Sequence, residues 1–102
     1  MPEKEQQNTN PDQQNQVLFM MLVQQHQQIG MMGLGEEENP GTGRKEKDLK
    51  TVKYAIDTLN MLEKYTSGNL SDEMSNYLKE TIKALQMKYV NASGSQGGGK
   101  NN

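Results

Sequence analysis

The sequence contains no cysteine and no tryptophan among its 102 residues, and phenylalanine occurs once. A chain without cysteine can form neither disulfide bonds nor thiolate metal sites. Hydrophobic residues make up 31% of the chain and aromatic residues 5%, so there is little material for a core. Small domains rarely obtain more than about 3–5 kcal/mol from their own core. We therefore expect the chain to bury apolar surface by self-association.

The chain also lacks a long hydrophobic run. The longest is "VLFMMLV", residues 17–23, which gives about 10 Å of helix where a membrane span needs ~30 Å. No membrane span is therefore expected. The first residues do not show a basic segment followed by an apolar one, so we expect no secretory signal and a cytoplasmic protein. The net charge of −2 gives no electrostatic reason to expect nucleic-acid binding.

Three segments differ in composition. Residues 1–16 are almost wholly polar and contain two helix-breaking prolines, Pro2 and Pro11. Residues 91–102, "NASGSQGGGKNN", have the Gly/Ser/Asn composition of a flexible linker. We predict that both ends are disordered tails. Residues 17–90 are then predicted to form a single helical domain.

The helical domain is predicted to contain three helices and no strand. The first runs from about Asn15 to Ile29 or Met32, where Gly30, Gly33 and Gly35 break it. Residues 36–47 have the acidic, Asn-Pro and Gly-Thr-Gly composition of a surface loop.

The second and third helices are predicted to form an antiparallel hairpin. Asp48 is a good N-cap for the second, whose apolar residues follow at helical spacing. Gly68 is expected to end this helix with a positive φ, which glycine adopts without a steric penalty. Ser71 is expected to cap the third helix, after a connection of four residues. The predicted fold is all-α, with an N-terminal helix packed beside this hairpin.

Two apolar surfaces indicate a homo-oligomer. Seven consecutive apolar residues cover the whole circumference of a helix, and one hairpin can bury about half of it. The second helix carries a further row, Tyr54, Thr58, Met61 and Tyr65, opposite its core side. A second copy of the chain is the simplest cover, and an unidentified protein partner or plain exposure of these side chains are the alternatives. The predicted interface comprises Val17, Leu18, Phe19, Leu22, Tyr54, Met61 and Tyr65.

The sequence predicts no catalytic residue, no metal site and no cofactor. His26 is the only histidine, and a metal site needs several ligands. The loop "GTGRK", residues 41–45, lacks the spacing and the preceding strand of a phosphate-binding loop. Asp57 has no second carboxylate close by in the sequence and is expected to be structural. A small anion-binding regulator or enzyme that uses residues 41–45 and Asp57 remains the alternative function, and peripheral membrane association through residues 17–23 a weaker one.

Residues 39–90 resemble a bacterial family known as domain of unknown function 1844. The resemblance lies in five blocks that keep their spacing: "NPGTG" at 39–43, "DL" at 48–49, "IDTLNML" at 56–62, "TSGNL" at 66–70 and "MKYV" at 87–90. This sequence departs from the family pattern at Met74, where a glutamate is usual, and at Tyr65, where a lysine is usual. The resemblance implies a compact helical domain and no known activity. Residues of these blocks and caps with expected structural roles are Gly43, Asp48, Asp57, Gly68, Asn69, Leu70 and Ser71.

Overall fold

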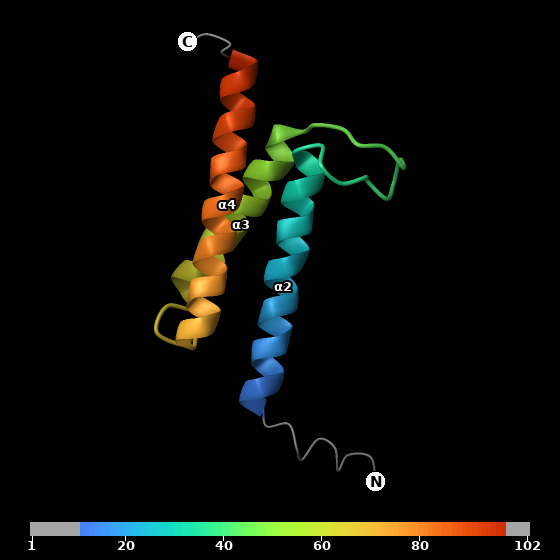
Figure 1. The fold of residues 1–102 in the computed structure, drawn as a ribbon. Coiled ribbons are helices and arrows are strands. Elements are labelled where there is room, and N and C mark those ends of the chain that lie inside the picture. The colour runs from blue at the N-terminus through green and yellow to red at the C-terminus, as the bar shows by residue number, and fades with distance from the viewer. Residues whose placement is uncertain (1–10, 98–102) are drawn as a thin grey trace.

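The computed structural model describes residues 11–97, which form three α-helices. These are α2 (Pro11–Gly33), α3 (Leu49–Tyr65) and α4 (Asp72–Gly97). Figure 1 shows that α3 runs back along α2 and that α4 reverses direction again, so that successive helices are antiparallel. The only β-type pairing among the described residues is in two isolated bridges, Leu34 with Lys47 and Asn39 with Arg44. The all-α fold class predicted from the sequence is confirmed.

Both outer helices extend further than predicted. The segments 11–16 and 91–97 were predicted as parts of disordered tails, but they are the first turns of α2 and the last turns of α4. Pro11 does not break α2, because proline is well tolerated in the first helical turn, where the N–H has no partner within the helix. At the other end, helix propagation adds a hydrogen bond per residue to an already nucleated helix. The remainder of the predicted tails, residues 1–10 and 98–102, lies outside the described residues.

The start of α3 is fixed by its N-cap, as predicted. Asp48 has extended backbone angles (φ −146°, ψ 95°), and its carboxylate accepts a hydrogen bond from the Lys50 N–H at 3.1 Å. The second carboxylate oxygen accepts from the Thr51 hydroxyl at 3.1 Å. Asp48 therefore satisfies one of the backbone donors that have no partner inside the helix.

A six-residue connection, Thr66 to Ser71, joins α3 to α4, where the sequence predicted four residues. Gly68 has the predicted positive φ, at +87°. The Asn69 N–H donates to the Thr66 carbonyl at 2.9 Å, which closes a turn with Gly68 at its third position. This arrangement is that of a type II turn, which requires a positive φ at that position.

The start of α4 follows the prediction as well. The Ser71 hydroxyl accepts a hydrogen bond from the Met74 N–H at 3.1 Å, which is the geometry of an N-cap. Asp72 and Glu73 lie in the first turn, where the helix dipole stabilises negative charge. Leu70 packs against the core and so ties the connection to the hairpin.

The core lies between all three helices. α2 packs on its own hairpin, which the sequence left open, and contributes Val23 to a cluster with apolar residues of α3 and α4. Thr81 is the one buried polar residue among those described, and its hydroxyl donates to the Tyr77 carbonyl at 2.9 Å. The cluster comprises Val23, Leu34, Val52, Ile56, Leu59, Leu78, Ile82 and Leu85.

Gly30 does not break α2, which is a correction to the sequence prediction, but α2 does end at Gly33, and Gly35 follows with a positive φ of +82°. Gly30 and Gly33 are both buried, and each marks a close approach to a neighbour. A Cβ at Gly33 would lie 2.7 Å from Val52 Cγ2 and 2.9 Å from two backbone atoms of α3 and its cap. A Cβ at Gly30 would lie 2.8 Å from Leu85 Cδ2 on α4. The two glycines therefore allow α2 to approach both helices of the hairpin.

Candidate functional site

The apolar stretch of α2 is only partly covered by the hairpin. Val23 is fully buried, while Phe19 and Leu22 are half-buried, with Phe19 packed against the core. The other four side chains stay exposed, with Leu18 at 61%. They are Val17, Leu18, Met20 and Met21. The structure thus assigns part of the stretch to the chain's own fold, and this part includes the predicted interface residue Phe19.

The predicted outer row of α3 is exposed as well. Tyr54, Met61 and Tyr65 are all accessible, and Tyr65 is 71% exposed. Half-buried His26 of α2 lies beside this row, with its ring centroid 5.9 Å from that of Tyr54. Because α2 and α3 are antiparallel, this contact aligns the row with the side of α2 that carries Leu18 and Leu22. We call this surface the α2/α3 face, and it comprises Leu18, Leu22, Tyr54, Met61 and Tyr65.

The five side chains of the α2/α3 face are uncharged, although Lys64 borders it, with its Nζ 5.5 Å from the centroid of the Tyr65 ring. Along all of α2, from residue 11 to residue 33, the only formally charged side chain is Asp12. Protein interfaces are depleted of charge at their centre and enriched in tyrosine and methionine. The composition of the face is therefore that of an interface centre.

A second apolar surface lies on the other side of α2. There, α2 and the start of α4 border an open groove of about 630 Å³. Its apolar walls are Val17 and Met20 of α2 and Met74 and Tyr77 of α4. We call it the α2/α4 groove, and its polar border comprises Gln13, Gln16, Ser71 and Glu73.

This groove is not evident from the sequence. Val17 is predicted to share one interface with the outer row of α3, but the structure places this residue on the opposite side of α2, in the groove wall. The only available signal was helical spacing, since Val17 and Met20 are three residues apart and Leu18 and Leu22 four apart. Which neighbour each pair faces depends on how α2 docks, and that is not encoded locally.

His26 is not in a reactive arrangement. Its Nδ1 lies 3.0 Å from the Leu22 carbonyl oxygen, one turn earlier in α2, and its ring packs near Tyr54. Within residues 11–97, no group of three or more histidine, aspartate or glutamate side chains could hold a metal ion. The described helices also include none that is long and apolar enough to cross a membrane.

The loop proposed for anion binding uses its backbone donors internally. The Gly41 N–H donates to the Asn39 side chain at 2.7 Å, and the Thr42 and Gly43 N–H groups donate to the Asn39 carbonyl. Gly43 adopts a positive φ of +71°, which explains why a glycine occupies this position. These bonds form a closed turn, and its N–H groups do not converge on an open anion site.

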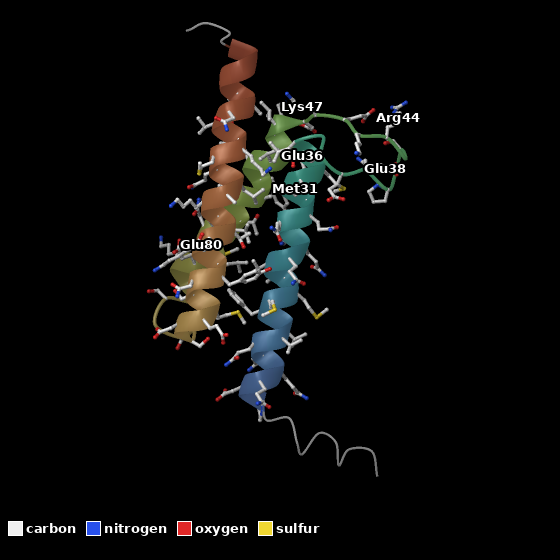
Figure 2. All side chains as sticks on the ribbon, in the orientation of Figure 1. Met31, Glu36, Glu38, Arg44, Lys47 and Glu80 are labelled. Atoms are coloured by element: carbon white, nitrogen blue, oxygen red, sulfur yellow. The ribbon has the colours of Figure 1, made fainter. Side chains whose placement is uncertain are left out.

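Two ion pairs lie near this loop. Arg44 contacts Glu46 with Nη2–Oε2 at 2.6 Å, and Lys88 of α4 reaches Glu36 at 3.2 Å. Figure 2 shows Glu38 and Arg44 at the outer end of the connection, while Glu36 lies beside the helices. The contact with Lys88 therefore ties the start of the connection to α4.

Asp57 makes an exposed ion pair on α3. Its carboxylate accepts a hydrogen bond from Lys53 Nζ at 2.8 Å, one turn earlier. This hydrogen bond and the negative charge of Asp57 raise the pKa of Lys53. An exposed pair at this spacing contributes little to stability, and it leaves Asp57 without the second carboxylate that acid–base catalysis would use.

Comparison with known proteins gives one finding. The family model described as Domain of unknown function (DUF1844) matches residues 16–91, a range that includes most of α2, all of α3 and most of α4. No curated protein and no solved structure matches the chain.

Proposed function

The chain belongs to the family named domain of unknown function 1844, and we propose that it is a small non-enzymatic module that functions by self-association. The observation that carries the proposal is the α2/α3 face, which remains exposed after α2 has packed on its own hairpin. A cytoplasmic location is part of the proposal, because a chain without cysteine suits a reducing compartment.

Physical chemistry favours a second copy as the cover for the α2/α3 face. Removing a large apolar side chain from water stabilises an interface by roughly 1.5–3 kcal/mol. α2 carries a single charged side chain, Asp12, so its part of the face can approach a second copy with little repulsion between like charges. A two-fold contact of this kind uses the same patch on both chains and closes with two subunits. An unidentified protein partner that competes for the same face is compatible with this role.

The alternative function as an anion-binding regulator or enzyme has less support. Anion sites at loops need several free N–H groups that converge on one point. In the 41–45 loop, three backbone N–H groups already donate to Asn39, and Arg44 already pairs with Glu46. Asp57 lies on α3 and pairs with Lys53. No observation therefore favours this alternative over self-association.

The experiment introduces an aspartate at each of the two most exposed positions of the α2/α3 face. The double variant Leu18→Asp with Tyr65→Asp would bury two charges without partners if the face is an interface, at a cost of several kcal/mol. Surface substitutions outside an interface usually change folding stability by less than about 0.5 kcal/mol. We expect the mass in sedimentation equilibrium to fall, while the helix content in circular dichroism is retained.

A matched control adds the same two charges to the same two helices. Gln24→Asp with Asn60→Asp lies on exposed positions of α2 and α3 outside the α2/α3 face, and it should keep the mass of the unmodified protein. If Leu18→Asp with Tyr65→Asp also keeps that mass, self-association does not use this face and the proposal is wrong.

A further inference from the structure

A regular row of exposed residues follows one side of α4. Its members are separated by four, three, four and three residues, which is the spacing of the seam in a coiled coil. At 100° per residue they lie within about 40° of a common line. All are exposed except Tyr77, which is half-buried, and Met87 is 58% exposed. We call this row the α4 seam, and it comprises Glu73, Tyr77, Glu80, Ala84 and Met87.

The α4 seam is continuous with the α2/α4 groove. Tyr77 and Glu73 belong to both, because the groove opens where the start of α4 faces the N-terminal half of α2. Figure 1 shows that the C-terminal part of α4 extends past the ends of the other helices. The same helix therefore carries an open apolar groove near its start and an exposed apolar side chain, Met87, nearer its C-terminal end.

The two halves of α4 have opposite charge. The first half, residues 72–80, contains three acidic side chains and one lysine, while residues 81–97 contain two lysines and no acidic residue. The neighbouring helix α2 has no lysine or arginine. The start of α4 is therefore acidic around the groove, and Lys83 and Lys88 follow further along the helix, of which Lys88 already pairs with Glu36. Opposite charges come together when a second α4 approaches in the antiparallel direction, and like charges come together when it approaches in parallel.

We propose that the α4 seam pairs with the α4 seam of a second copy, antiparallel and across a two-fold axis near Ile82. Pairing that places Tyr77 opposite the second copy's Met87 also places Glu80 opposite its Ala84 and next to its Lys83. Figure 2 shows Glu80 on the outside of the bundle, accessible to such a contact. This interface is distinct from the α2/α3 face, so each can persist without the other.

The side chains suit this pairing. Methionine is unbranched and adaptable, so Met87 of the second copy can enter the α2/α4 groove and make a sulfur–aromatic contact with Tyr77. Ala84 is small, which lets the two helices approach closely near the axis. Because the same patch is used on both chains, this contact by itself joins two copies. Chains that also use the α2/α3 face would form larger assemblies.

The test exploits the charges at the axis. Glu80→Lys alone places the introduced lysine of each copy beside Lys83 of the other, and Lys83→Glu alone places two glutamates together in the same way. Each variant should weaken the α4 contact at least about tenfold. In an equimolar mixture, a mixed pair has lysines at positions 80 and 83 of one chain and glutamates at positions 80 and 83 of the other. Opposite charges are therefore restored at both crossings of the mixed pair. Association should therefore recover in the mixed pair only, and interactions within one chain cannot produce this recovery.

The measurement is sedimentation velocity of each variant and of the mixture, with one variant carrying a fluorescent label to identify mixed species. Both positions are exposed, and lysine and glutamate have similar helix propensities, so circular dichroism should show unchanged helix content. Recovery in the mixture supports the proposal. Single variants with the sedimentation of the unmodified protein, or a mixture without recovery, would overturn it. Because the α2/α3 face is tested at Leu18 and Tyr65, failure of one interface is distinguishable from failure of the other.

Discussion

Gly68 fixes the conformation of the turn that follows α3. Its φ of +87° lies in the region that side chains with a Cβ rarely adopt, and a Cβ placed there would meet no atom within 4 Å. The cost of Gly68→Ala is therefore purely conformational. We expect the free energy of unfolding to fall by about 1 kcal/mol or more, measured by urea denaturation.

Gly94 provides a control of opposite sign. It lies within α4, has no positive φ, and likewise has open space around it. Since alanine is favoured over glycine inside a helix by roughly 1 kcal/mol, Gly94→Ala should leave stability unchanged or raise it. If both substitutions have the same effect, the positive φ at Gly68 does not constrain the fold.

Residues with a local role were largely predictable, and residues with a tertiary role were not. Asp48, Gly68 and Ser71 act through their own backbone neighbourhood. The two N-caps and the positive φ of Gly68 are confirmed, although α3 ends earlier than predicted, with Thr66 as its C-cap. The same local rules interpret Gly30, Gly33 and Gly35 as the end of the first helix, which is wrong for Gly30, since α2 continues to Gly33. Gly30 and Gly33 also leave room for Leu85 and Val52, which lie far away in the sequence.

At the scale of the helices, the crossing of α2 over α3 depends on Gly33. A Cβ there would meet the Asp48 carbonyl oxygen and the Val52 nitrogen at 2.9 Å each, and backbone atoms cannot rotate away. The Asp48 N–H also donates to the Gly33 carbonyl at 2.7 Å, which joins the two helices directly. Gly33→Ala should therefore separate α2 from α3 and lower the free energy of unfolding by about 1–3 kcal/mol or more.

Gly30→Ala is the matched comparison for this prediction. There the closest atoms are the terminal carbons of Leu85, a flexible side chain that can shift. The added methyl also improves helix propensity by roughly 1 kcal/mol, which offsets part of the strain. Thermal unfolding should rank Gly33→Ala as clearly less stable than Gly30→Ala. The reverse order would show that α2 does not cross α3 at Gly33 as described.

The hairpin was easier to predict than the helix ends. α3 and the middle of α4 carry apolar residues at regular spacing between good capping residues, so pattern and capping agree. The first turns of α2 and the last turns of α4 have polar side chains and no regular row of apolar residues. Their composition therefore predicted disordered tails. They are helical because they continue helices whose central turns pack on the core, a contribution that a local pattern does not contain.

For the whole molecule, the three helices bury one compact core but leave apolar side chains on two sides of α2. The α2/α3 face was partly foreseen, because the row on α3 and the stretch 17–23 are visible in the sequence. The α2/α4 groove was not, since it depends on how α2 docks against the hairpin. The fold is thus closed around its own core, while the two exposed apolar surfaces are candidate interaction sites.

The most direct test of self-association is the mass of the unmodified 102-residue chain in sedimentation equilibrium across a concentration series. Two copies held by an interface with micromolar affinity or better should be mostly associated at tens of micromolar. We expect a mass of at least twice 11.5 kDa there, falling toward 11.5 kDa on dilution. A constant mass of 11.5 kDa at every concentration would contradict the account.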